Sequence, residues 1–464
     1  MARRIPAREI AGYSAGSVGT GGFGTLPGLV LAYYLTDTLA VPALLASIVV
    51  IVPKVWDVVI DPAIGAMSDA EASRRHSRTR LMTVGALTLP IGFIGTFAVP
   101  EGWSPAAAAG WVLIFFVLAT SSFSLFQVPY IALPADLTDG YRERTRLMSW
   151  RIATLTLTIL LVGAGGPALR DGAGGGRSGY LVMGVVIAAV LLAGMLGAVG
   201  GLRRHRARPT HDAAPVGLRA GYVAGLDVVR GEPAYRSLLS VFVLQALAVG
   251  IMLGAAQYVA TYVLGNQGAL TFVFLALVAP ALVVMPLWTR YAARHGKPVA
   301  LRTASIGFLI ATLGLLGLLA APGWWVYVVV AVAGVSYAGM QLFPLAMLPD
   351  VINAAGRERG GTMSGVWTAG ETAGLALGPS IVLIALALGG FSSSVGGVVV
   401  DQPESARVAI VLAFSALPAV LVSLSLLVLG RYREPAPSPA AAEPNLRQSG
   451  EGPSGPPHLG SLDL

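Results

Sequence analysis

The chain has 464 residues, of which 55% are hydrophobic and only 12% charged, and it carries a formal net charge of +8 without any cysteine. Soluble globular proteins carry about 25% charged residues, so this composition excludes a soluble protein and predicts one that crosses a membrane several times. The absence of cysteine excludes disulfides, thiolate metal sites and a cysteine nucleophile.

Long apolar runs follow one another along the chain. A membrane-spanning helix needs about 20 predominantly apolar residues, and twelve runs meet this requirement. They lie near 10–35, 41–68, 81–99, 105–134, 149–169, 179–201, 237–264, 270–291, 300–321, 323–348, 361–390 and 406–430. The sequence therefore predicts an all-α membrane protein with twelve transmembrane helices.

One long polar link separates the first six runs from the last six, and a Pro/Ser/Gly/Ala-rich tail follows the last run. Such a tail buries too little apolar surface to fold. We expect an N-terminal six-helix bundle at 1–201, a cytoplasmic linker at 202–236, a C-terminal six-helix bundle at 237–433 and a disordered cytoplasmic tail at 434–464.

The basic residues are concentrated in alternate connections. They precede the first run and follow runs 2, 4, 6, 8, 10 and 12, whereas the other connections hold few. By the positive-inside rule, both termini are cytoplasmic and the protein is a multi-pass protein of the plasma (inner) membrane. The positive net charge thus reflects the membrane topology. We expect the lipid bilayer to be a partner and do not expect binding to nucleic acid. We expect a monomer.

Two segments indicate an internal repeat. At a constant shift of 215 residues, Pro129 and Pro134 match Pro344 and Pro349, and the Arg-Glu-Arg of 142–144 matches that of 357–359. Both segments run from the fourth span of a half into its fifth. Parallel repeats of six spans are the architecture of the major facilitator fold, which holds its substrate between the halves at mid-membrane.

Three charges interrupt the second apolar run. Lys54, Asp57 and Asp61 fall within a helical sector of about 60°, and charges at mid-bilayer are costly enough to indicate function. Two carboxylates one turn apart can bind a small cation such as Na⁺ or share a proton. Two structural alternatives stay open: Asp57 neutralises Lys54, and Asp61 caps a break in the helix before Pro62.

Other charges suggest a gate at the cytoplasmic edge. Asp69 follows the second run and precedes several arginines. An aspartate there can pair with basic residues and hold the inward face shut. We assign this gate to Asp69, Arg78, Arg142 and Arg144.

Polar and aromatic residues inside other spans are candidates for the wall of a substrate cavity. Arg151 either snorkels to the interface or pairs inward with an acid, and Glu371 is either functional or paired with a base near a helix end. The glutamines either line the cavity or tie helices together. The predicted cavity residues are Lys54, Gln127, Ile131, Arg151, Gln257, Gln341, Trp367, Glu371 and Thr372.

Four segments resemble the signatures of one transporter family. They are WDVVIDPAIGAMSD (56–69), QVPYIALPADLTDGYRERTRL (127–147), PLWTRYAARHGKP (286–298) and MLPDVI (347–352). They are similar to the glycoside–pentoside–hexuronide cation symporters of the major facilitator superfamily, the family of melibiose permease. The resemblance implies that Asp57 and Asp61 bind the coupling Na⁺, Li⁺ or H⁺, and that a hydroxyl on span 4, at Ser124, assists.

The sequence departs from that family at its sugar site. Ile60 stands where sugar carriers have an asparagine, which removes one oxygen ligand. The positions of the sugar-holding acids hold Gly21 and Gln127, the stacking aromatic is replaced by Ile131, and the lysine of span 11 by Thr372. Because this change weakens a sodium site, we slightly prefer H⁺ over Na⁺ as the coupling ion. We expect no other cofactor.

Two transport functions follow. The first is symport of a small solute, a glycoside or sugar derivative, driven by H⁺ or Na⁺ through alternating access. The alternative is proton-driven export of a hydrophobic or amphipathic metabolite, drug or lipid. We do not expect an enzyme, because all five histidines fall in predicted connections or the tail and no span carries a nucleophile–base pair.

Overall fold

The computed structural model describes residues 5–137, 141–203, 218–355 and 360–434, and within these ranges its regular elements are helices joined by short connections. Their bounds are α1 (Ala7–Tyr33), η1 (Tyr34–Thr38), α2 (Ala43–Arg75), α3 (Thr79–Phe97), α4 (Pro105–Leu137), α5 (Tyr141–Gly172), α6 (Gly176–Leu202), α7 (Leu218–Gly231), α8 (Pro233–Tyr258), η2 (Val259–Val263), α9 (Ala269–His295), α10 (Lys297–Gly314), η3 (Leu315–Leu319), α11 (Trp325–Ala355), α12 (Gly360–Leu388), α13 (Glu404–Phe414) and α14 (Ala416–Leu429). The expected all-α membrane fold is confirmed.

The helices agree closely with the apolar runs. By length and composition, ten of the described helices are able to cross a membrane, or eleven if the two parts of α9, bent by 40°, form one span. The remaining long helix, α1, fails this test because its many glycines, serines and threonines lower its mean hydropathy. The count of twelve spans therefore stays a prediction. Within the predicted linker, the structure adds the helix α7.

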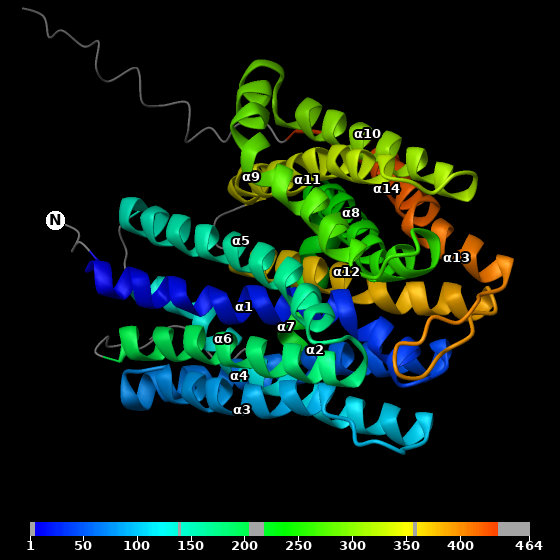
Figure 1. Cartoon of the computed structure of the whole chain (residues 1–464). Coiled ribbons are helices and arrows are strands. Elements are labelled where there is room, and N and C mark those ends of the chain that lie inside the picture. Colours follow the sequence, from blue (N-terminus) through cyan, green and yellow to red (C-terminus); the bar gives the residue numbers. More distant parts are fainter. Residues whose placement is uncertain (1–4, 138–140, 204–217, 356–359, 435–464) are drawn as a thin grey trace, which may run out of the picture.

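The helices form two groups (Figure 1). Helices α1–α6 pack mainly against one another, and so do α8–α14. The groups meet where α12 packs on α2, α9 on α5, and α8 on α1. We call them the N-terminal group and the C-terminal group.

Glycine allows the closest helix approach within the C-terminal group. A Cβ atom added to Gly378 of α12 would lie 2.1 Å from the carbonyl carbon of Gly250 in α8. No side chain fits at that distance, so the backbones of α8 and α12 are in direct contact. Small residues serve the same purpose in other membrane helix pairs.

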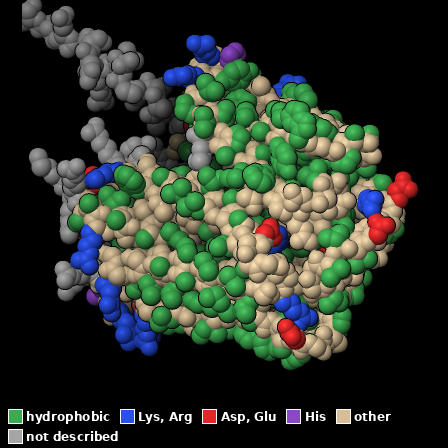
Figure 2. Space-filling model, in the orientation of Figure 1, with side chains coloured by type: hydrophobic (Ala, Val, Ile, Leu, Met, Phe, Trp, Pro, Cys, Tyr) green, Lys and Arg blue, Asp and Glu red, His purple; other side chains and the backbone are tan. Residues whose placement is uncertain are grey.

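The two ends of the molecule differ in charge. Lys and Arg side chains gather at the end where α1 begins, on the left in Figure 2, whereas the middle of that view is mostly hydrophobic side chains interspersed with uncharged side chains and backbone. We call this the basic end. The opposite end holds η1, η2 and the segment 389–403, and we call it the far end.

Candidate functional site

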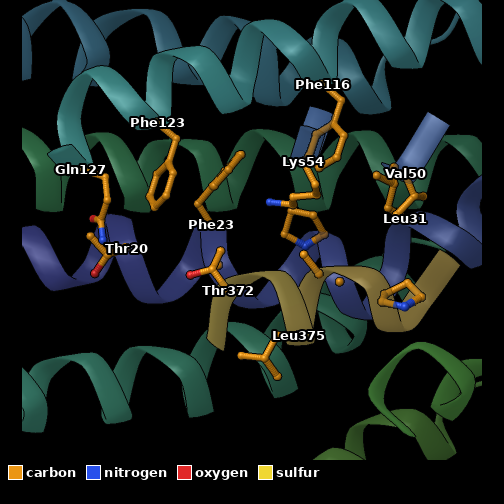
Figure 3. Close-up of a pocket in the computed structure, with 15 residues that line it drawn as sticks. Thr20, Phe23, Leu31, Val50, Lys54, Phe116, Phe123, Gln127, Thr372 and Leu375 are labelled. Carbon is orange, nitrogen blue, oxygen red and sulfur yellow. The ribbon is translucent and has the colours of Figure 1, made fainter. Parts of the chain in front are cut away.

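A cavity of about 250 Å³ lies between the two groups (Figure 3). Its wall is largely apolar and aromatic, with a few polar side chains from α1, α2, α4 and α12. The lining residues are Thr20, Phe23, Gly24, Pro27, Gly28, Leu31, Val50, Lys54, Phe116, Phe123, Gln127, Thr372, Leu375, Ala376 and Pro379. Three predicted cavity residues, Lys54, Gln127 and Thr372, therefore line one cavity.

The charged stripe of α2 adjoins this cavity. Lys54 lines it, and its Nζ lies 3.6 Å from Oδ2 of Asp57. Asp61 follows one turn later. One oxygen of Asp57 and one of Asp61 are buried without a hydrogen-bond partner among the described residues. Unpartnered buried acceptors are costly, so both carboxylates keep an unused acceptor position in this structure.

Two hydroxyl groups of α4 face these carboxylates. Ser124 interacts with Asp61, and Thr120 interacts with Asp57. Sequence analysis did not identify Thr120. The signal was present, because Thr120 and Ser124 are four residues apart, the same spacing as Asp57 and Asp61, and residues at that spacing share a helix face. Two carboxylates and two hydroxyls thus converge between α2 and α4.

Two other predicted residues of the N-terminal group lie outside the cavity wall. Arg151 of α5 points inward, and its guanidinium carbon lies 5.5 Å from the ring centre of Tyr130. The Tyr130 hydroxyl donates to the carbonyl oxygen of Tyr13. Ile131, one turn beyond Gln127 on α4, is 47% exposed.

In the C-terminal group, the predicted residues form local contacts. Glu371, next to the cavity residue Thr372, interacts with Gln341, whose Nε2 donates to the Tyr337 hydroxyl. Trp367 is 2% exposed and stacks on Phe242 with ring centres 4.5 Å apart. Trp367 is therefore a packing residue in this conformation.

Gln257 belongs to the far end. Its side chain is fully buried and accepts a hydrogen bond of 2.9 Å from Arg170 of α5. The same guanidinium pairs with Asp171 and contacts the Tyr180 hydroxyl. Gln257 thus ties the two groups together away from the cavity.

Further contacts join the two groups at the far end. Asp37 of η1 is fully buried and accepts a hydrogen bond from Tyr262 of η2. The neighbouring Thr36 hydroxyl lies 2.8 Å from that of Tyr258. Sequence analysis left Asp37 without a role, although it is the only charge between residues 10 and 53.

A segment of the C-terminal group also pairs with the chain after α1 at this end. The backbone nitrogens of Ser394, Gly396 and Gly397 donate to the carbonyl oxygens of residues 36, 38 and 37 at 2.9–3.0 Å. Leu39 and Val395 form an antiparallel bridge. We call residues 392–397 the far-end segment. Any opening at this end has to break these bonds.

The predicted gate at the basic end is only partly described. Arg78 is 4% exposed and donates a hydrogen bond of 2.8 Å to the Ser68 hydroxyl. The side chains of Asp69, Arg142 and Arg144 lie outside the described residues. The gate stays a prediction.

The chain is similar to several transporters. It is 25% identical over 452 residues to sodium-dependent lysophosphatidylcholine symporter 1 of Gallus gallus, covering 87% of this chain and 82% of the relative. It is 26% identical to an uncharacterised symporter of Synechocystis sp., covering 94% and 95%. A crystal structure of a D-xylose–proton symporter has the same fold, with a TM-score of 0.65 at 14% identity and coverage of 92% and 98%.

These relatives are named as membrane transporters. The cavity between the two helix groups of this chain is consistent with such a function. The narrower resemblance to the glycoside–pentoside–hexuronide symporters stays a prediction. The sequence profile described as MFS/sugar transport protein matches residues 12–434. This chain therefore belongs to the MFS/sugar transport protein family.

Proposed function

We propose that this protein is a sodium-coupled symporter of an amphipathic lipid with one acyl chain and an anionic phosphate group, with its basic end in the cytoplasm. The observation that carries the proposal is the position of Lys54. It lines the central cavity and at the same time pairs with Asp57 of the carboxylate stripe. One side chain therefore connects the ion site to the substrate site.

The ion site suits a hard cation. Hard cations prefer oxygen ligands, and Asp57, Asp61, Thr120 and Ser124 bring carboxylate and hydroxyl oxygens together. Sequence analysis slightly preferred a proton, because Ile60 replaces an oxygen ligand. Thr120 supplies another oxygen on the same side, and the relatives named as sodium-dependent add support for Na⁺.

The cavity suits an amphipathic substrate better than a sugar. Phe23, Phe116 and Phe123 offer apolar surface, and Lys54 offers a single positive charge (Figure 3). At Gly21 an added Cβ would lie 3.1 Å from Leu155, so a sugar-binding acid at this position would require Leu155 to shift. A cavity of about 250 Å³ holds a headgroup and part of a chain. The relatives named for lysophosphatidylcholine agree with this class.

Coupling follows from competition for Asp57. When Na⁺ binds between Asp57 and Asp61, it replaces the Lys54 ammonium as the partner of the Asp57 carboxylate. The freed ammonium then holds the anionic group of the substrate in the cavity. With both charges neutralised, the two helix groups can rock past each other at lower desolvation cost. Ion binding thus precedes tight substrate binding.

Transport in proteoliposomes tests this proposal. An inward Na⁺ gradient should accumulate labelled lysophosphatidylcholine in vesicles of the wild-type protein. Asp57→Asn and Asp61→Asn should abolish accumulation, and Lys54→Gln should weaken lipid binding while Na⁺ binding persists. Asp401→Asn, an exposed acid at the far end, is the matched control and should transport normally. Normal accumulation by both stripe variants would refute the ion site.

The apolar cavity also supports the second candidate, proton-driven export of an amphipathic compound. The same vesicles distinguish the two. Efflux driven by a proton gradient, with no response to Na⁺, would favour the exporter, and Na⁺-dependent accumulation of melibiose in place of lipid would favour a sugar carrier.

A further inference from the structure

A second, separate groove opens at the basic end of the N-terminal group. It lies between the end of α2 and the start of α3 and has a volume of about 520 Å³. Helix α4 packs against both α2 and α3. The lining residues are Met67, Ala70, Glu71, Arg74, Arg75, Arg80, Leu81 and Val84. We call it the α2–α3 groove.

The mouth of the α2–α3 groove is positively charged. Arg74, Arg75 and Arg80 line it and are exposed, and none of them forms an ion pair with a carboxylate that the structure describes. The one acid in the wall is otherwise engaged. The two oxygens of Glu71 accept the backbone N–H groups of Arg80 at 2.9 Å and Leu81 at 3.2 Å. Glu71 thus caps α3, and among the described residues no carboxylate pairs with the three guanidinium groups.

An apolar stripe continues from this mouth along α3. Met67 in the groove wall is 54% exposed and Val84 is 43% exposed, and Leu87 and Ile91 are 53% and 60% exposed. Spacings of three and four residues place Val84, Leu87 and Ile91 on one face of the helix. In a membrane-spanning helix, an exposed apolar face contacts acyl chains. A cationic mouth above such a face matches a lipid and not a free phosphate ion.

We propose that the α2–α3 groove binds an anionic phospholipid of the surrounding leaflet. The guanidinium groups of Arg74, Arg75 and Arg80 hold the phosphate, and the acyl chains lie along Val84, Leu87 and Ile91. Basic pockets between membrane helices on the cytoplasmic side are known to hold anionic headgroups. This site is distinct from the central cavity and does not depend on which substrate that cavity takes.

The corresponding place in the C-terminal group provides a comparison. There α9 and α10 pack against each other, and the Tyr291 and Thr303 hydroxyls are 3.2 Å apart. Lys297 pairs with Asp350 at 2.6 Å. Three exposed arginines, Arg290, Arg294 and Arg302, stand in these helices. These three arginines match the number and type of charges at the mouth of the α2–α3 groove, and they therefore serve as a control for a general effect of charge.

Native mass spectrometry of the full-length protein tests the proposal, with phosphatidylglycerol and phosphatidylcholine of equal chain length as probes. The wild type should retain phosphatidylglycerol preferentially. The triple variant Arg74→Gln, Arg75→Gln, Arg80→Gln should bind it at least about tenfold more weakly. The control triple variant Arg290→Gln, Arg294→Gln, Arg302→Gln should bind as the wild type does.

Two outcomes would overturn the proposal. One is an equal loss in both triple variants, which indicates only a general effect of charge. The other is full competition by glycerol phosphate at the same concentration as the lipid, which indicates a phosphate site without a role for the chains. If the triple variant does not fold, Arg80→Gln and Arg80→Lys replace it, and only the glutamine variant should lose phosphatidylglycerol.

Discussion

Tyr262 of η2 donates a hydrogen bond to the buried carboxylate of Asp37 in η1, and this contact joins the two helix groups at the far end. The residues are 225 positions apart in the chain. The adjoining far-end segment adds backbone bonds to residues 36–38. In the proposed alternating-access cycle, these contacts form and break in each turnover.

Tyr262→Phe should shift the protein towards a state open at the far end. A side-chain hydrogen bond contributes about 0.5–1.5 kcal/mol, so the ratio of open to closed states should rise roughly threefold to tenfold. Because the chain lacks cysteine, a single Thr372→Cys reports access to the cavity. A membrane-impermeant maleimide applied at the far end should label it faster in the variant.

Arg407→Gln is the control for that experiment. It breaks an ion pair with Asp401 near the same end but within the C-terminal group. Its labelling rate should equal that of the parent protein. Equal rates in Tyr262→Phe and Arg407→Gln would show that the contact with Asp37 does not hold the end closed.

Ser124→Ala and Thr120→Val should weaken binding of the coupling ion without changing the substrate cavity. Loss of one hydroxyl ligand costs about 0.5–1.5 kcal/mol, so the Na⁺ concentration for half-maximal uptake should rise roughly threefold to tenfold. The substrate KM at saturating Na⁺ should stay the same. Ser122→Ala is the control, because the Ser122 hydroxyl donates to the Leu118 carbonyl within α4. A rise of the same size in Ser122→Ala would contradict the assignment.

Trp367→Ala should destabilise the protein, because it removes a buried ring that stacks on Phe242. Truncation of a buried tryptophan costs about 3–5 kcal/mol. Thermal unfolding of the purified protein should therefore begin at a clearly lower temperature, and Trp367→Phe should recover most of the loss. If Trp367→Ala instead unfolds normally and loses substrate binding, Trp367 belongs to the cavity after all.

Gly378→Val and Gly24→Val should have opposite consequences. At Gly378 a side chain collides with the backbone of Gly250, and overpacking of this kind costs about 1–3 kcal/mol or more. At Gly24 an added Cβ meets no atom within 4 Å, and the residue lines the cavity. Gly378→Val should lower the unfolding temperature, whereas Gly24→Val should keep it and raise the substrate KM. Equal unfolding temperatures would disprove the close contact of α8 and α12.

The sequence by itself determined most of the helices and placed together the charged residues of the proposed ion site. Apolar runs set the ends of most helices to within a few residues, because the length of an apolar run is a local property. Helical spacing placed Lys54, Asp57 and Asp61 on one stripe, for the same reason. The resemblance to known symporters added Ser124, which interacts with Asp61 in the structure; its role in ion binding stays a prediction.

Only the tertiary structure decided which distant residues meet. It brought Thr120 to Asp57, buried Trp367 against Phe242, and placed Gln257 beside Arg170. It also joined Asp37 to Tyr262 and formed an arginine-lined groove between α2 and α3. A polar side chain in an apolar span can face either a neighbouring helix or the cavity. That choice depends on how the helices rotate and pack, which no single run of sequence records.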